Sequence, residues 1–283
     1  MTDDPCFGSS AEGRVLREEE AETVAKQTMA PPHKVCIRID PYTLGLFTSI
    51  QKEARANWDR FYKRNKDNFF KDRNWSHVDL REMCPHLNFD GPLTYLEAGC
   101  GVGNMQFPLA EAFPHWRWQA FDFSANAVRL LEQRAQEIGL EVETAEVDLS
   151  VKRESSSVFE SGTKADLATL IFVLSAVHPS AHTTVAENLA ELIKPGGTLV
   201  VRDYGINDFA MIRFGREAKL GERFYARQDG TRAYYFTLEE LEAPFAQAGF
   251  RCERREFLHR RTINKEKGVN VPRVFVQAVF VRE

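Results

Sequence analysis

The 283-residue sequence predicts an α/β protein built on a doubly wound, mostly parallel sheet. Strand-like and helical segments alternate over residues 94–205, the pattern of parallel strands joined by right-handed crossovers. The first strand runs into a glycine-rich turn at residues 99–103 (GCGVG), and an apolar helical pattern follows. Two strand-like segments, 250–263 and 271–282, close the chain, and the period of two in the second half of the last one favours an antiparallel pair.

The composition is that of an ordinary globular protein, with 43% hydrophobic and 28% charged residues, which excludes disordered and collagen-like classes. At this length roughly three quarters of the unfolded surface can be buried, so a large core is available. The five cysteines are odd in number and contain no CxxC pair, so we expect no metal site and a reducing compartment. No run approaches about 18 apolar residues, and we therefore expect no membrane span.

Periodicity and capping residues define the individual elements. Ser124 is placed to cap the second helix of the alternating region, and Gly139 is placed to end it. Thr237 and Glu240 offer a capping box for a helix that runs to Gly249. Strands are expected at 95–98, 116–122, 142–147, 166–177 and 198–205.

The chain divides into three parts, the last of which contains two segments of opposite net charge. Residues 1–49 are irregular and are expected to form a mobile tail, and 50–90 form a helical segment, rich in aromatic and basic residues, that covers the site. Residues 91–283 form the α/β domain with an insertion at 206–236, which is too long for a simple connection. Counted from the sequence, the net charges are −3 over 1–49, +2 over 50–90, −7 over 91–201 and +4 over 202–283. The total of −4 therefore conceals an acidic centre between basic flanks that suit an anionic partner.

The glycine turn and two acids that follow strands indicate a nucleotide-type cofactor site. Gly99 and Gly101 let the backbone turn tightly and approach a ligand beside a helix N-terminus. Asp122 could accept hydrogen bonds from both ribose hydroxyls and Asp148 could meet an adenine amino group, since ligands in such sheets bind at the carboxyl ends of strands. For each Asp the alternative role is a helix cap. Both NAD and S-adenosylmethionine suit the crevice, although the dinucleotide fingerprint requires its third glycine one residue later than Gly103.

Three features together resemble the class I S-adenosylmethionine-dependent methyltransferases. They are the GxGxG turn, the KPGG sequence at 194–197 before the fifth strand, and the terminal strand pair. The resemblance implies a Rossmann-like sheet of seven strands with an antiparallel last strand, and S-adenosylmethionine as the cofactor.

Longer blocks resemble the eukaryotic tRNA 3-methylcytidine methyltransferases over about residues 50–283. The blocks are WDRFYKRNKDNFFKDRNW (58–75), LEAGCGVGN (96–104), LIFVLSAVHP (170–179), VRDYGINDFAMIRF (201–214), FYARQDGTRAYYFT (224–237) and VPRVFVQ (271–277). Within the family, KLGERFYARQDGTRAYYFT and INKEKGVNVPRVFVQ most resemble the branch that acts on serine tRNAs. The resemblance implies 3-methylcytidine formation at position 32 of the anticodon loop and seryl-tRNA synthetase as a partner. We expect a monomer in the cytoplasm, with the nucleus as a second compartment.

The same resemblance assigns further residues to the cofactor pocket. Trp58 and Tyr62 would wall it from the N-terminal helix, and Ile171 would lie beneath the cofactor. Leu149 would face adenine together with Asp148. Taken alone, aromatic and isoleucine side chains at such positions are ordinarily core residues.

Methylation of cytidine at its ring nitrogen requires positioning above all, because the in-plane lone pair attacks the methyl group directly. We expect Asp203, just past the fifth strand, to stabilise the cationic ring and accept a proton from the exocyclic amine, with Tyr204 holding or stacking the base. An ion pair with Arg202 is the alternative role for Asp203. The resemblance adds Arg273, in contact with base or phosphate, and Phe69, which would stack.

Basic side chains of the flanks are the candidates for RNA contacts, interleaved with aromatic residues that can stack on unpaired bases. They are Lys63, Arg64, Lys71, Arg73, Arg213, Arg227, Arg232, Arg254, Arg255, Arg260, Arg261, Lys265 and Lys267. An amphipathic helix with a solvated basic face is the alternative for 58–75.

Two other functions compete, a non-catalytic RNA-binding adaptor and a small-molecule methyltransferase. The intact turn and both acids argue against the first, and the basic flanks and the insertion argue against the second. Threonine and arginine tRNAs are the alternative substrates.

Overall fold

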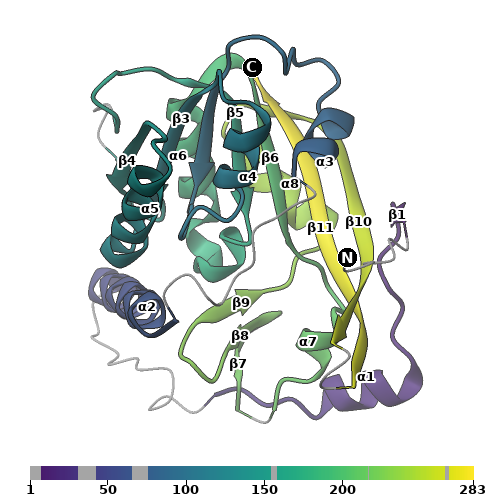
Figure 1. Cartoon of the computed structure of the whole chain (residues 1–283). Helices are drawn as coiled ribbons and strands as arrows, with labels where there is room; N and C mark the ends of the chain where they lie inside the picture. The colour runs from purple at the N-terminus through teal and green to yellow at the C-terminus, as the bar shows by residue number, and fades with distance from the viewer. Residues whose placement is uncertain (1–7, 31–42, 66–75, 154–157, 216, 265–267) are drawn as a thin grey trace.

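The computed structural model describes residues 8–30, 43–65, 76–153, 158–215, 217–264 and 268–283. Within these ranges a sheet of eight strands runs through the molecule in the order β1-β10-β11-β6-β5-β2-β3-β4 (Figure 1). The strands are β1 (Ser9–Ser10), β2 (Thr94–Ala98), β3 (Arg117–Asp122), β4 (Val142–Glu146), β5 (Ala165–Ile171), β6 (Ile193–Tyr204), β10 (Phe250–Asn264) and β11 (Val269–Arg282).

The strand directions confirm the predicted doubly wound sheet. Strands β4, β3, β2, β5 and β6 are parallel, whereas β11 is antiparallel to both β6 and β10. The expected seven strands are present, and β1 is an additional edge strand that pairs Ser9 with Leu258.

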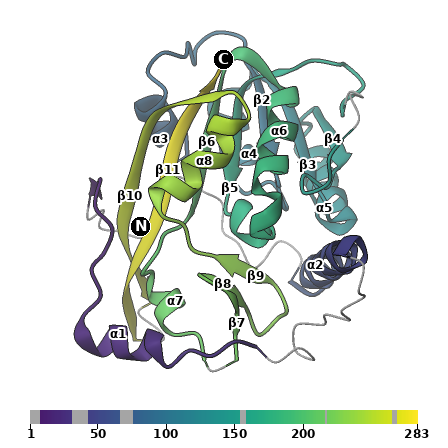
Figure 2. The same cartoon turned by 180° about the vertical axis from the view of Figure 1, so that it is seen from behind.

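Helices cover both faces of this sheet. The helices of the described residues are α1 (Glu18–Ala25), α2 (Thr43–Asn65), α3 (Ser76–Met83), α4 (Gln106–Ala112), α5 (Ala125–Glu137), α6 (His182–Leu192), α7 (Phe209–Ile212) and α8 (Leu238–Gln247), with short 3₁₀ turns at Leu174–Ala176 and Pro179–Ala181. Helices α3, α4 and α5 lie on one face, and α6 and α8 lie on the other (Figures 1 and 2). The predicted caps are confirmed, since the Ser124 hydroxyl accepts from the Ala127 N–H and Thr237 forms a capping box with Glu240.

Alternate side chains of the central strands pack against the two helical layers. In β6, Leu199 and Val201 belong to the cluster beneath α6 and α8, whereas Val200 belongs to the cluster with α3 and α4. Both faces are therefore apolar, as expected for parallel strands covered on each side.

The insertion, 206–236, forms a separate lobe at one end of the sheet (Figure 1). It contains α7 and a three-stranded antiparallel sheet of β7 (Lys219–Gly221), β8 (Phe224–Ala226) and β9 (Arg232–Tyr234). No helix in the described part of the chain is long and apolar enough to cross a membrane. In the same part, no three His, Cys, Asp or Glu side chains gather as a metal site.

Residues 8–30, expected to belong to a mobile tail, contain β1 and α1, and α2 begins at Thr43, within that expected tail. The Gln27 amide donates to the carbonyls of Met211 and Ile212 at 3.0 and 3.2 Å, at the end of α7. Its Oε1 accepts from the Tyr225 hydroxyl at 2.9 Å. These partners all come from the insertion, so the order of this segment depends on tertiary contacts that its own composition does not show.

Candidate active site

The turn after β2 requires glycine at Gly99. Its φ is +67°, and a Cβ there would lie 2.5 Å from Cγ2 of Val173. Gly101 has a φ of +54°, and its Cβ would lie 2.7 Å from the Tyr62 hydroxyl. The turn is therefore enclosed between the segment that follows β5 and helix α2.

Asp122, the last residue of β3, fixes this turn from the neighbouring strand. Its Oδ2 accepts from the Gly101 N–H at 3.0 Å, and its Oδ1 accepts from the Ser124 N–H at 2.9 Å. The residue is 5% exposed, and burial raises its pKa to about 6. Each carboxylate oxygen has further acceptor capacity, so Asp122 can also accept hydrogen bonds from a ligand.

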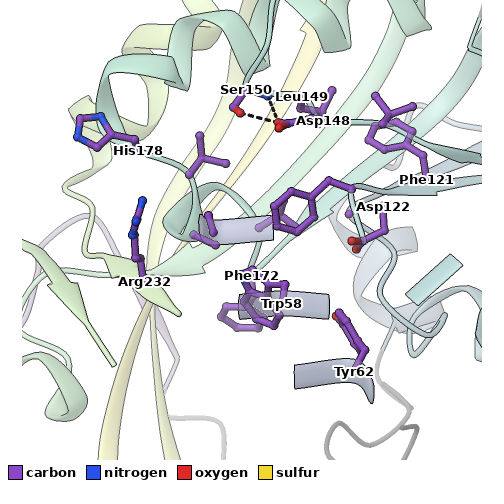
Figure 3. A pocket seen from close by; sticks show the side chains of 17 residues that line it. Trp58, Tyr62, Phe121, Asp122, Asp148, Leu149, Ser150, Phe172, His178 and Arg232 are labelled. Atoms are coloured by element: carbon purple, nitrogen blue, oxygen red, sulfur yellow. Dashed lines mark hydrogen bonds between the residues drawn. The ribbon is translucent and has the colours of Figure 1, made fainter. Parts of the chain in front are cut away.

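A pocket with about 830 Å³ of empty space, counted out to its open mouth, lies at the carboxyl ends of β2, β3, β4 and β5 (Figure 3). This is the place of a small-molecule site in a doubly wound sheet. Its walls come from α2, from the segments after these strands, and from β9 of the insertion. The lining residues are Ala54, Trp58, Tyr62, Gly99, Phe121, Asp122, Phe123, Val147, Asp148, Leu149, Ser150, Phe172, Val173, Ala176, Val177, His178 and Arg232.

The predicted adenine-facing residues, Asp148 and Leu149, both line this pocket. Asp148 Oδ1 accepts from the N–H and the hydroxyl of Ser150 at 2.9 and 2.5 Å, which holds the carboxylate in place (Figure 3). Leu149 beside it is 6% exposed. The two residues thus combine a fixed acceptor with an apolar surface.

Helix α2 supplies the predicted wall, with Trp58 and Tyr62 in the lining. Their rings are stacked with centroids 5.9 Å apart. Asp59, between them in sequence, accepts a hydrogen bond from the Ser124 hydroxyl at 2.5 Å. Helix α2 is therefore anchored to Ser124, which lies two residues past Asp122 in the sequence.

The predicted strand 166–177 is too long, because β5 ends at Ile171. Phe172 then has a φ of +59°, which is rare for a bulky residue and recurs at functional sites. Phe172 lines the pocket, whereas Ile171 does not and packs with the cluster that contains Tyr95. An apolar run looks the same in a buried strand and in a 3₁₀ turn, so the pattern could not show where the strand stops.

Beside the pocket, two arginines lie over the ring of Tyr204. The guanidinium carbons of Arg227 and Arg273 are 5.2 and 5.8 Å from the centre of its ring, and we call these three residues the Tyr204 cluster. The ring of Phe172 is 5.0 Å from that of Tyr204, so the cluster adjoins the pocket. Asp208 is fully buried and accepts from Arg273 Nε at 2.8 Å, which fixes this guanidinium.

Asp203 lies next to the cluster but does not line the pocket. It is fully buried and accepts from the N–H groups of Ser175 and Tyr204 at 2.9 and 2.8 Å. Burial raises its pKa to about 6. The alternative of an ion pair with Arg202 is wrong, because that guanidinium bonds to Gln277 at 2.7 Å and approaches Asp79 at 3.2 Å instead.

The predicted RNA-contacting residues fall into several groups. Lys63, Arg64 and Arg213 are exposed. Arg254 pairs with a glutamate at 2.8 Å, and Arg255 pairs with two, at 2.8 and 3.3 Å. Arg260 and Arg261 bond to the carbonyl of Gly8 and the side chain of Asn270, respectively. Phe69, Lys71, Arg73, Lys265 and Lys267 lie outside the described residues.

Arg232, predicted to contact RNA, lines the pocket instead. Its side chain is 8% exposed and lies 3.4 Å from a carboxylate oxygen of Glu53 on α2. Figure 3 shows it near His178 at the edge of the pocket. The sequence reveals that Arg232 is basic, but only the position of β9 decides which side of the lobe it faces. Phe172 was missed for a similar reason, because it lay inside the predicted strand.

The fold and the pocket define a class I S-adenosylmethionine-dependent methyltransferase. The residues present fit this cofactor, because Asp122 offers charged acceptors for a ribose diol and Asp148 with Leu149 offers a polar and an apolar contact for adenine. Solved structures share the architecture. A SAM-dependent methyltransferase from Anabaena variabilis superposes with a TM-score of 0.61 at 17% identity, covering 81% of this chain and 95% of that one.

Comparison of sequences gives the family. Residues 50–254 match the family described as a methyltransferase domain. The chain is 45% identical to tRNA N(3)-cytidine methyltransferase METTL6 of Mus musculus over 232 residues, which cover 82% of each protein. It is 40% identical to the Homo sapiens protein of that name over 273 residues, covering 96% of this chain and 91% of the other. The chain belongs to the family of tRNA N(3)-cytidine methyltransferases, so the predicted family, enzyme class and cofactor are confirmed.

Proposed function

We propose that the protein transfers a methyl group from S-adenosylmethionine to N3 of cytidine 32 in the anticodon loop of serine tRNAs. The observation that carries the proposal is the place of Phe172, which lines the cofactor pocket while its ring lies 5.0 Å from that of Tyr204. A base held at the Tyr204 cluster would therefore adjoin the cofactor. Family membership supports the reaction, and the resemblance of residues 219–237 and 263–277 to the serine branch supports the choice of tRNA.

The chain's own residues act in this reaction mainly by positioning. Cytosine N3 carries an in-plane lone pair at neutral pH, so no base has to remove a proton before it attacks. The cofactor, when bound, supplies a methyl group activated by a positively charged sulfur. Tyr204 and Arg273 hold the ring, and Asp208 keeps Arg273 in place.

Methylation makes the ring cationic, and a nearby anion stabilises that charge in a buried site. Asp203 is the proposed anion, because its pKa of about 6 leaves it ionised at neutral pH. Its carboxylate accepts from the Tyr204 N–H at 2.8 Å, so its charge lies close to the residue that holds the base. Phe69 remains the proposed second stacking residue.

The remaining expectations concern partners and compartment. We propose a monomer that works with seryl-tRNA synthetase in the cytoplasm, and additionally in the nucleus. The flanks carry net charges of only +2 and +4. Binding of tRNA by the protein alone should therefore be salt-sensitive and weak, which favours a partner that also holds the tRNA.

The test is mass spectrometry of tRNA nucleosides after incubation with S-adenosylmethionine, with and without the synthetase. We expect 3-methylcytidine in a serine tRNA transcript and none in a transcript with uridine at position 32. Asp122→Ala and Asp203→Ala should abolish the product. Methylation that survives in Asp122→Ala would contradict the cofactor assignment, and methylation restricted to threonine or arginine tRNA would contradict the branch assignment.

A further inference from the structure

Two contacts join the cofactor wall on α2 to the insertion. The Asn57 side-chain amide donates to the Gly230 carbonyl at 2.7 Å, and Arg232 lies 3.4 Å from Glu53. Asn57 is 6% exposed, so its hydrogen bond is shielded from water and is costly to leave unmade. The lobe and the helix therefore meet through a buried polar contact.

The chain is shaped for this contact at Gly230. Its φ is +83°, and a Cβ there would lie 2.9 Å from Nδ2 and 3.0 Å from Cγ of Asn57. Any other residue would meet both backbone strain and a steric conflict with the side chain that donates the hydrogen bond.

On its other side, α2 is fixed to the cofactor site. Asp59 accepts from the Ser124 hydroxyl at 2.5 Å, and Trp58 and Tyr62 line the pocket. The Asn57 side chain is thus one residue away from the cofactor wall on the same helix. A displacement of α2 at Asn57 would move that wall.

The turn at 227–231 also reaches the substrate side. The Gly230 N–H donates to the Arg227 carbonyl at 3.0 Å, and the Arg227 N–H donates to the Thr231 carbonyl at 2.8 Å. These bonds close the turn into one unit, and its first residue places a guanidinium 5.2 Å from the centre of the Tyr204 ring. One short turn therefore contacts both the Tyr204 cluster and the helix that walls the cofactor.

We propose that Asn57 is a positioning residue that couples the two sites: RNA engaged by Arg227 and the lobe fixes the 227–231 turn, and the turn holds α2 against the cofactor through Gly230. This inference rests on the proposed function, because it requires tRNA as the substrate. It follows that tRNA and cofactor each bind more tightly in the presence of the other, by the same factor. A contact that only stabilises the fold would give no such dependence.

The experiment measures the dissociation constant of S-adenosylhomocysteine by calorimetry, without and with saturating serine tRNA transcript, the synthetase being present throughout. For the wild type we expect tRNA to tighten binding at least about fivefold, the lower range of site-to-site coupling. Asn57→Asp keeps the size and the acceptor of the side chain but loses the amide donor. Gly230→Ala disturbs the same contact from the other side. Both variants should bind S-adenosylhomocysteine about equally well with and without tRNA.

The matched control is Gly221→Ala, a glycine of the same lobe whose added Cβ would meet only Cβ of Phe224, at 3.9 Å. It should retain the wild-type dependence on tRNA. Unchanged coupling in either Asn57→Asp or Gly230→Ala overturns the proposal, as does a wild type whose affinity for S-adenosylhomocysteine is the same with and without tRNA. Formation of 3-methylcytidine by the wild type is scored separately, so failure of the coupling is distinguishable from failure of the proposed function.

Discussion

Replacing Asp122 with alanine should strongly weaken cofactor binding while changing stability little. The variant leaves two buried backbone N–H groups without their acceptor, at a cost of about 1–3 kcal/mol each. It also removes a carboxylate whose pKa is raised from 3.8 to about 6, which corresponds to about 3 kcal/mol of destabilisation when the group is ionised. These two effects largely offset each other in the free energy of unfolding.

Binding has no such compensation. Two hydrogen bonds from ribose hydroxyls to a charged acceptor are lost. This loss amounts to about 3–6 kcal/mol, or roughly a 10²- to 10⁴-fold larger dissociation constant. Calorimetry with S-adenosylhomocysteine measures the affinity, and circular dichroism melting shows that the variant is folded. Asp90→Ala is the control, because its carboxylate pairs with Arg81 at 2.8 Å and is 80% exposed, outside the pocket. A folded Asp122→Ala variant with an affinity within tenfold of the wild type would refute the reasoning.

Gly99→Ala should lower the free energy of unfolding more than Gly139→Ala, since both have φ near +67° but only Gly99 would meet a neighbouring side chain. Urea unfolding measures the free energy of unfolding of both variants. Equal losses would show that backbone strain of about 1–2 kcal/mol accounts for the entire destabilisation and that the contact with Val173 adds nothing. The affinity for S-adenosylhomocysteine should rise as the pH passes about 6, because ionised Asp122 is the better acceptor. The free energy of unfolding contributed by the same group should fall as the pH rises from about 4 to 6, because in this range the folded state holds a proton that the unfolded state has released. If the affinity of Asp122→Ala still rose with pH in this range, Asp122 would be excluded as the group responsible for the pH dependence. Asp208→Asn should cost about 3–5 kcal/mol in chemical denaturation by breaking a buried ion pair, and it should slow methylation by releasing Arg273. Wild-type stability in that variant would contradict the role of the pair.

The parts of the site that could be predicted are those fixed by local chain geometry. Gly99 directly follows β2 and Asp122 is the last residue of β3. Adjacent parallel strands end at one edge of the sheet, so their meeting follows from the strand pattern alone. Asp148 was predictable in the same way. Such residues need no knowledge of distant contacts.

The parts that could not be predicted depend on tertiary position. Arg232 has the same chemistry as Arg213, yet one lines the pocket and the other is exposed. Phe172 adopts a left-handed conformation that no property of phenylalanine favours, so surrounding contacts must impose it. The segment 8–30 is held by partners far along the chain, at residues 211–214 and in β10, which the local sequence does not contain.

The pairing of β1 with β10 has a consequence for the order of events during synthesis. The Ser10 hydroxyl is hydrogen-bonded to His259, 249 residues further along the chain. A ribosome that adds roughly 5–20 residues per second therefore leaves the first segment without its partner for about 10–50 s. The parallel strands β2 to β6 are complete well before that time. A nascent chain can thus assemble its cofactor-binding half early, whereas the edge formed by β1 closes only after β10 has left the ribosome.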